Sequence, residues 1–193
     1  MPPIDLADFV SAVPPQAFAG DEVQLWLFRG RTPGEVPLRQ LLSTYLGVPA
    51  AALPIVRGPH GKPALATPAR LHFNLSHSGD LTVVALSSAY EPGIDVEFPG
   101  RERPVQALAR RYFTSTEADA LAALPPERAA AAFLALWSCK EAVLKALGRG
   151  IAFGLHRLTI RIEREFEPVQ PERDAGKPHE WQLHRLRLGA AGG

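Results

Sequence analysis

Apolar and polar positions alternate in several short stretches of the first half of the chain. Residues 71–76 alternate strictly between apolar and polar side chains, which is the period of a half-buried strand. Residues 81–86 form a second apolar run after a Ser-Gly turn, and residues 23–28 form another that includes Trp and Phe. Residues 93–98 resume the alternation, with the apolar side chains at every second position. We therefore predict four strands in this part of the sequence.

Helical patterns flank this region and dominate beyond residue 100. Residues 38–46 place their apolar side chains on one face and stop at a glycine. Thr114-Ser115-Thr116-Glu117 has the spacing of a capping box before a short helix that ends near residue 124. Pro125-Pro126 then begins a longer helix that runs to about residue 147. Two late strands are predicted at 157–162 and 181–188.

Strands and helices in this arrangement indicate an α+β fold. We expect two similar-sized, pseudo-symmetric subdomains, residues 1–92 and 93–193. Each is expected to be a small, mostly antiparallel sheet with helices.

Composition restricts the classes of partner. The net charge of +1 gives no global reason to expect a nucleic acid. No apolar run approaches the roughly 20 residues that cross a bilayer, so no membrane is expected. The single cysteine, Cys139, cannot form an internal disulfide, and the N-terminus lacks a signal-peptide profile. The sequence thus predicts a cytoplasmic protein.

Asp95 and Glu97 are the first candidate functional residues. Carboxylates two apart on a strand project from the same face, so both can reach one hard cation through their oxygen atoms. The alternative is a solvent-facing strand edge, which base rates favour for this pair taken alone.

The helix around Trp137 carries the second candidates. Glu141 and Lys145 lie one turn apart at the flank of its apolar arc, whereas Lys140 lies inside that arc. An i,i+4 ion pair is the alternative interpretation of Glu141 and Lys145, worth a few tenths of a kcal/mol. It leaves Lys140 unexplained, because a buried lysine needs a partner.

Residues 72–79 contain the third candidates, Ser76 and His77. A serine, a histidine and backbone N–H groups at a glycine turn can hold phosphate oxygens. Taken alone, a hairpin turn with a capping serine is the better alternative. A serine hydrolase is a poor one, because adjacent strand residues point apart and no nucleophile-elbow pattern is present.

Together, in this order, the three segments resemble the signature blocks of the surfactin-type 4'-phosphopantetheinyl transferases. The blocks are Asn74-Leu75-Ser76-His77-Ser78-Gly79, Gly93-Ile94-Asp95-Val96-Glu97 and Trp137-Ser138-Cys139-Lys140-Glu141-Ala142-Val143-Leu144-Lys145. Gly61-Lys62-Pro63 and residues 111–117 match two weaker blocks. The resemblance implies transfer of phosphopantetheine from coenzyme A to a serine of an acyl or peptidyl carrier protein, with release of 3',5'-ADP and dependence on Mg²⁺. It also implies a monomer whose active site lies between the two subdomains.

The resemblance assigns a role to each candidate residue. Asp95, Glu97 and Glu141 would bind Mg²⁺, and Glu141 is also the candidate base. Lys145 would act in catalysis on the phosphates. The coenzyme A site would comprise Lys62, Ser76, His77, Lys140 and Lys145, with Lys140 buried against the active-site carboxylates.

Two features depart from the family pattern or extend it. Residues 29–35 pass almost directly from strand to helix, where relatives carry a basic stretch, so Arg29, Arg31 and Arg39 are the candidate substitutes for binding the 3'-phosphate. Arginines at 101, 103, 110 and 111, followed by Tyr112 and Phe113, predict a docking surface for an acidic carrier helix.

Two other functions stay open at this point. One is a degenerate relative that binds coenzyme A without transferring from it. The other is a different Mg²⁺-dependent phosphotransferase, which the absence of a phosphate-binding Gly-x-x-x-x-Gly-Lys-Ser/Thr loop disfavours.

Overall fold

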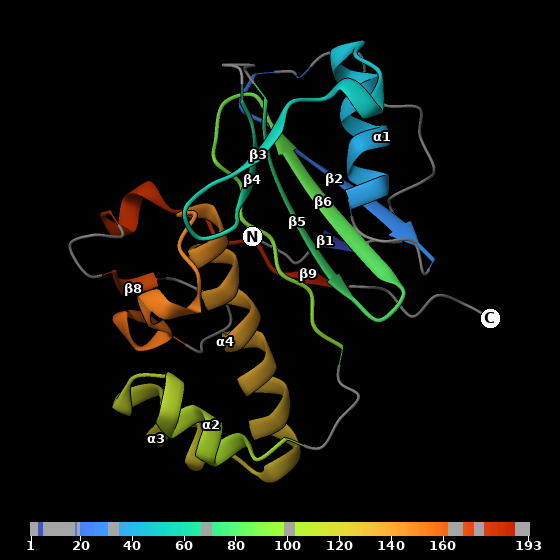
Figure 1. Cartoon of the computed structure of the whole chain (residues 1–193). Coiled ribbons are helices and arrows are strands. Elements are labelled where there is room, and N and C mark those ends of the chain that lie inside the picture. Colours follow the sequence, from blue (N-terminus) through green and yellow to red (C-terminus); the bar gives the residue numbers. More distant parts are fainter. Residues whose placement is uncertain are drawn as a thin grey trace.

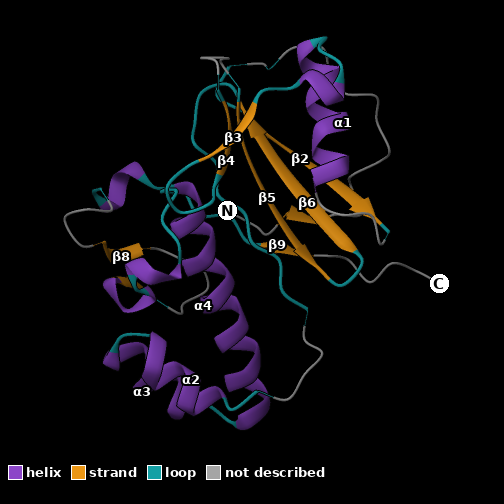
Figure 2. Ribbon diagram, viewed as in Figure 1, coloured by secondary structure: helices purple, strands orange, loops and turns teal. Residues whose placement is uncertain are grey.

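The computed structural model describes residues 4–5, 18, 20–30, 35–66, 71–98, 103–161, 168–171 and 176–187. Its strands are β1 (Ile4–Asp5), β2 (Val23–Arg29), β3 (Ile55–Arg57), β4 (Pro63–Leu65), β5 (His72–Ser78), β6 (Leu81–Ser87), β7 (Leu158–Ile160), β8 (Pro168–Pro171) and β9 (Leu186–Arg187). Its helices are α1 (Glu35–Leu46), α2 (Val105–Tyr112), α3 (Ser115–Ala122) and α4 (Pro126–Ala146). The predicted α+β class is confirmed (Figure 2).

An antiparallel sheet with the order β2-β6-β5 forms the first half of the molecule. Its middle strand β6 is buried along its whole length, because it has a neighbour on both edges and packing on both faces. Helix α1 covers one face (Figure 1), where Leu38 and Leu42 pack against Phe73 and Val84. These strands and α1 lie where the apolar pattern predicts them.

The opposite face of the sheet is covered by the segment that follows β6. Leu81 and Val83 of the sheet pack there against Ile94, and Val96 joins the same apolar cluster. Leu186 of β9 also packs on this face, and β9 pairs in parallel with β1. The last described strand therefore packs with the first half of the chain. The predicted division at residues 92 and 93 stays a prediction.

The predicted strand at residues 93–98 is wrong. These residues run beside β5, but their N–H groups bond to its side chains and not to its backbone. Because strand side chains stand perpendicular to the sheet, the segment lies over the face of the sheet and does not add to its edge. The contacts are Ile94 N to Asn74 Oδ1 (2.9 Å), Val96 N to Ser76 Oγ (3.2 Å) and Phe98 N to Ser78 Oγ (3.4 Å).

Three helices and β7 build the core of the second half. Phe113, Leu121, Phe133 and Ile160 belong to one buried apolar cluster to which α3, α4 and β7 contribute. The predicted capping box is present at the start of α3: Glu117 N donates to Thr114 Oγ1 (3.3 Å), and Thr114 N donates to the Glu117 carboxylate (3.0 Å). Helix α4 begins at the predicted prolines.

Some elements differ from the sequence prediction. Helix α2 and the β3–β4 hairpin were not predicted; the hairpin encloses the Gly-Pro-rich loop at 58–62. Of the strand predicted at 181–188, Leu186–Arg187 is a strand, residues 181–185 are not, and residue 188 lies outside the described residues. None of the helices in the described residues is long and apolar enough to span a bilayer.

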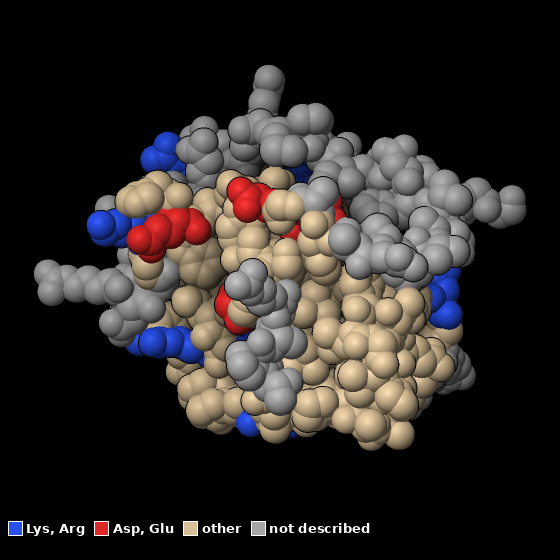
Figure 3. Space-filling model, turned by 90° about the horizontal axis from the view of Figure 1, so that it is seen from above, with Lys and Arg blue, Asp and Glu red and all other residues tan. Residues whose placement is uncertain are grey.

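Charged side chains of both signs lie close together on the face seen in Figure 3. Acidic groups stand beside Lys and Arg at one side of this face, and much of the rest is uncharged. The described part of this face therefore carries no extended surface of a single sign.

Candidate active site

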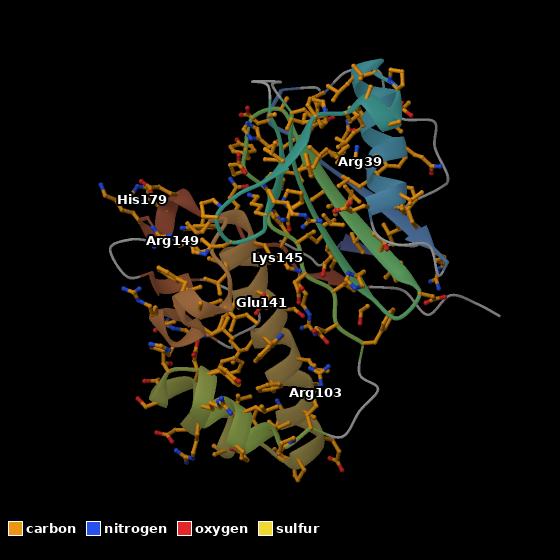
Figure 4. All side chains as sticks on the ribbon, in the orientation of Figure 1. Arg39, Arg103, Glu141, Lys145, Arg149 and His179 are labelled. Carbon is orange, nitrogen blue, oxygen red and sulfur yellow. The ribbon has the colours of Figure 1, made fainter. Side chains whose placement is uncertain are left out.

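Gly93 brings the segment with the predicted carboxylates against α4. A Cβ atom at this position would lie 1.9 Å from the carbonyl oxygen of Ala142 and 2.6 Å from the amide nitrogen of Ala146. No side chain fits in that space, so only glycine allows this close approach of backbone to helix. The contact sets residues 94–97 directly beside Glu141 and Lys145 (Figure 4).

Ser76, Asp95 and Lys145 form a hydrogen-bonded triangle between β5, the 93–98 segment and α4. Lys145 Nζ lies 2.6 Å from Asp95 Oδ1 and 2.9 Å from Ser76 Oγ, and Ser76 Oγ donates to Asp95 Oδ1 at 2.9 Å. The Asp95 side chain is only 7% exposed, whereas that of Lys145 is 28% exposed. Lys145 thus neutralises a carboxylate that is almost removed from water. This contact replaces the i,i+4 pair with Glu141 that the sequence alone allows.

Glu141 lies one turn before Lys145 on the same side of α4 (Figure 4). Burial raises the pKa of its carboxyl group, the negative charges of Asp95 and Glu97 raise it further, and Lys145 acts in the opposite direction. Glu141 Oε1 and Asp95 Oδ2 are both buried without a hydrogen-bond partner. Unpartnered buried oxygens are rare in folded proteins, and a bound ion or water is the usual explanation.

Glu97 takes part in a different contact. Its carboxylate accepts a hydrogen bond from the Arg103 guanidinium at 2.8 Å, with both side chains roughly one quarter to one third exposed. Arg103 lies just before α2 (Figure 4). It is nearer than Lys145 to the N-terminal end of α4. The negative charge of Glu97 therefore raises the pKa of Glu141. Its hydrogen bond with Arg103 also fixes the chain just before α2.

Lys62 reaches the end of α4 from the loop between β3 and β4. Its Nζ donates to the carbonyl oxygen of Ala146 at 2.9 Å and to Glu91 Oε2 at 2.7 Å. Glu91 also contacts His72 Nδ1 at 2.5 Å, and the hydrogen bonds from Lys62 and His72 outweigh its burial, so the pKa of its carboxyl group is lowered. His77 is exposed and points away from Ser76. The structure brings Lys62 beside the helix that carries Lys145, and it leaves His77 at the surface.

Lys140 lies outside this site. It is fully buried, and its Nζ donates to Glu117 Oε2 (2.6 Å), to the carbonyl oxygen of Leu155 (2.9 Å) and to that of Leu158. Its three donors are therefore all used within the second half. The expectation that Lys140 is buried against Asp95, Glu97 or Glu141 is corrected: its carboxylate partner is Glu117. The sequence offered one clue, since a lysine within an apolar arc must have a partner.

The candidate substitutes for the 3'-phosphate site are spread over the first half. The Arg39 guanidinium donates to the carbonyl oxygens of Ala50 (3.1 Å) and Leu53 (3.3 Å), so it fastens α1 to the turn after it. Arg29 is exposed at the end of β2. Arg31 lies outside the described residues.

The described residues hold no group of three His, Cys, Asp or Glu close enough together to bind a metal ion. They do hold the Asp95–Glu141 pair with its two unpartnered oxygens. Mg²⁺ is commonly bound through one or two carboxylates with water and substrate phosphates completing its shell. The donors present fit a hard cation of this kind that is shared with a phosphorylated substrate.

Sequence comparisons match both halves of the chain to one group of enzymes. The family model of the 4'-phosphopantetheinyl transferase superfamily matches residues 91–191, which is more than half of the chain. A second family model, for the N-terminal part of 4'-phosphopantetheinyl transferases, matches residues 31–89.

Three curated relatives illustrate the similarity. The 4'-phosphopantetheinyl transferase psf-1 of Bacillus pumilus is 38% identical over 133 residues, 68% of this chain and 55% of its own length. The 4'-phosphopantetheinyl transferase HetI of a Nostoc species is 36% identical over 158 residues, 80% of this chain and 64% of its own length. The 4'-phosphopantetheinyl transferase Sfp of Bacillus subtilis is 30% identical over 134 residues, 68% of this chain and 58% of its own length. The matched region thus spans less than two thirds of each relative.

Proposed function

The chain belongs to the 4'-phosphopantetheinyl transferase superfamily, and from that premise we propose that it transfers the phosphopantetheine arm of coenzyme A to a serine of an acyl or peptidyl carrier protein. The other product is 3',5'-ADP. The Trp-Ser-Cys-Lys-Glu-Ala form of the helix motif favours carriers of polyketide or nonribosomal peptide biosynthesis. Monomeric state and cytoplasmic location stay predictions.

One observation supports this proposal above the others. Asp95 and Glu141 each keep one buried oxygen without a partner, at the point where Lys145 also lies. Two carboxylates held close together with a lysine cost free energy unless the site serves a ligand, because buried charged groups need full compensation. A cation and a diphosphate would satisfy both the carboxylates and the lysine.

Mg²⁺ would be held by Asp95 and Glu141, with Glu97 nearby. Bound there, it would neutralise negative charge on the diphosphate of coenzyme A during transfer. Glu97 contributes its charge, and Arg103 fixes its side chain.

The protein side chains have distinct tasks in this proposal. Glu141 accepts the proton of the carrier serine, directly or through a water. The serine oxygen forms a bond to the β-phosphorus of coenzyme A, and the bond from that phosphorus to the bridging oxygen breaks. The electron pair leaves with 3',5'-ADP. Lys145, freed from Asp95, holds the phosphate oxygens as a point charge.

The nucleotide end of coenzyme A would lie against the first half. Lys62 and Ser76 stand beside α4, within reach of the same ligand as Lys145. A contact of His77 with coenzyme A stays a prediction, because its exposed side chain points away from Ser76. Lys140 has no donor left for a ligand, so we assign it no contact with coenzyme A.

The alternative is a relative that binds coenzyme A without transferring from it. Retention of Asp95, Glu141 and Lys145 in one site argues against it, because a binding module has no need of the carboxylates. Two measurements separate the alternatives: calorimetric binding of coenzyme A, and intact-protein mass spectrometry of a panel of apo carriers incubated with coenzyme A and Mg²⁺. The transferase predicts binding together with a mass gain of one phosphopantetheine on at least one carrier. Binding without any mass gain across carriers of both biosynthetic classes would support the alternative.

A further inference from the structure

Lys140 and Glu117 are the most fully buried charged residues in the described part of the chain, and the proposed reaction uses neither. Their side chains are 0% and 3% exposed, and Lys140 Nζ lies 2.6 Å from Glu117 Oε2. The ring of Phe113 lies beneath the ammonium group, 5.0 Å from its centroid. This pair is sealed within the core of the second half, so it cannot touch a substrate.

The hydrogen bonds of this pair join three parts of the backbone. Lys140 belongs to α4 and donates to the carbonyl oxygens of Leu155 and Leu158. Glu117 belongs to α3; its Oε1 accepts from Ile160 N at 2.7 Å and its Oε2 from Thr114 N at 3.0 Å. Hydrogen bonds weaken steeply when donor and acceptor are misaligned. The network therefore permits one orientation of α4 relative to α3 and β7.

Apolar contacts alone do not restrict α4 in this way. Phe133, Leu136 and Leu144 share the buried face of the helix with Lys140, and contacts of this kind are not directional. On the other side of the helix, Lys145 donates to Asp95 and Ser76, and Lys62 donates to the carbonyl oxygen of Ala146, but the proposed function gives both lysines to coenzyme A. The Lys140–Glu117 network is buried and stays intact when those lysines turn to the ligand, so it can keep the rotation of α4 about its axis fixed.

The proposed site depends on that rotation. Glu141 directly follows Lys140 in the chain, and its Oε1 has no hydrogen-bond partner that would hold it independently. Side chains extend roughly 6 Å from a helix axis, so a turn of about 10° displaces a carboxyl group by about 1 Å. A misplacement of this size at a catalytic site can cost about a hundredfold in rate.

We propose that the Lys140–Glu117 pair is a positioning element, which holds Glu141 and Lys145 opposite Asp95 by fixing the rotation of α4. The proposal rests on the proposed function for its effect on catalysis, although not for its effect on geometry. Buried ion pairs can often be replaced by apolar side chains without loss of stability. Apolar side chains could therefore supply the stability that this pair gives. They could not supply the directed hydrogen bonds that orient α4.

The test compares Lys140→Met with Leu136→Ala. Leu136 is also 0% exposed and lies one turn earlier on the same face of α4, but it makes no directed polar contact. Both variants are expected to lose stability, so activity is measured at a temperature where each is fully folded by circular dichroism. Lys140→Met should lower kcat for transfer about a hundredfold and change KM for coenzyme A by less than about threefold. Leu136→Ala should keep kcat within about threefold of the unmodified chain. Equal losses of kcat in the two variants, or none in Lys140→Met, would overturn the proposal.

Glu117→Gln provides a second variant in case Lys140→Met does not fold. It keeps the shape of the side chain and removes its charge, and it should lower kcat at least tenfold. Crystal structures supply a readout that does not depend on activity. In either polar variant, Lys145 Nζ should move out of hydrogen-bond distance of Asp95 Oδ1, and in Leu136→Ala it should stay. An unmoved Lys145 in the polar variants would refute the positioning role, whereas absence of transfer by the unmodified chain would refute only the proposed function.

Discussion

The carboxylates of Asp95 and Glu141 define the site at the scale of single residues. Asp95→Ala and Glu141→Gln should each lower transfer by about a hundredfold or more, because a lost cation ligand removes several kcal/mol of charge stabilisation. Both variants should stay folded, since relief of the repulsion between the two acids offsets lost contacts. Single-turnover transfer is the measurement for the rate.

Thermal unfolding checks the same assignment without any reaction. Mg²⁺ that binds only the folded chain should raise the Tm of the unmodified protein. The Mg²⁺-induced rise in Tm should be much smaller in Asp95→Ala. Equal Mg²⁺-induced shifts in the two proteins would place the cation elsewhere.

Lys145 separates the catalytic interpretation from a structural one. Lys145→Met leaves Asp95 and Glu141 without a neighbouring cation, so unfolding in EDTA should occur at a lower temperature than in the unmodified chain. Added Mg²⁺ should restore much of that Tm but not the rate, which should stay about 10²- to 10³-fold low because a phosphate contact is missing. A rate that recovers together with the Tm would show that Lys145 has only a structural role.

Cys139 should be unreactive in the folded protein. Burial is the main cause that raises the pKa of its thiol to about 12. The thiolate, which is the reactive form, is therefore scarce at pH 8 and becomes abundant only as the pH approaches that value. Labelling with iodoacetamide, followed by mass spectrometry, should show little modification at pH 8 and full modification in denaturant. Rapid labelling of the native protein at pH 8 would contradict the raised pKa of this thiol.

Single residues also show what the sequence can reveal about a site. Asp95, Glu141, Lys145 and Ser76 stand out as polar residues in apolar patterns, and the structure places them together. The partner of Lys140 could not be predicted, because the capping box already accounts for Glu117. Glu117 both caps α3 and binds Lys140, and only the capping role can be recognised from the spacing of neighbouring residues.

At the scale of elements, the 93–98 segment tests how the two halves meet. Gly93→Ala should destabilise the protein by about 1–3 kcal/mol, the usual cost of overpacking, because its Cβ would meet helix backbone that cannot move aside. Transfer should fall as well, since Asp95 would shift away from α4. Chemical denaturation and a transfer assay measure the two effects.

Gly150→Ala is the matched control for this variant. Gly150 has a φ of −75°, and no atom lies within 4 Å of the place that a Cβ would take, so alanine should be neutral or slightly stabilising there. If Gly93→Ala were as stable and active as Gly150→Ala, the close approach of Gly93 to α4 would be disproved.

The strand prediction failed here for a physical reason. The alternation of residues 93–98 is real, and Ile94 and Val96 do face the sheet. Sequence periodicity reports which side chains are buried, but it does not report whether the backbone bonds to a neighbouring strand. Here the side chains of Asn74, Ser76 and Ser78 accept the hydrogen bonds that the backbone of a neighbouring strand would otherwise accept. No pattern in the sequence shows this.

At the scale of the whole molecule, the predicted carrier surface needs revision. Arg103 pairs with Glu97, and Phe113 is buried in the core, so neither is free to bind a carrier. Arg110 and Arg111 stay exposed on α2, although Arg110 lies 3.5 Å from Asp119. Arg101 lies outside the described residues. The remaining basic surface is therefore the exposed face of α2.

Charge reversal of Arg110 and Arg111 together should lower kcat/KM for an acidic carrier and leave KM for coenzyme A nearly unchanged. Opposite charges raise encounter rates at low ionic strength, and the effect should fade at 0.5 M salt, where the Debye length is about 4 Å. Steady-state kinetics at two salt concentrations make the comparison. An unchanged kcat/KM for the carrier at low salt would place docking on another surface.

The central claim is that Asp95, Glu141 and Lys145 form a phosphopantetheine-transfer site. Its most direct test is intact-protein mass spectrometry of an apo carrier after incubation with coenzyme A, Mg²⁺ and either the unmodified chain or Glu141→Gln. The account predicts that the carrier gains one phosphopantetheine with the unmodified chain. It predicts almost no gain with Glu141→Gln, or with the unmodified chain in EDTA. Equal modification of the carrier by both proteins would contradict it.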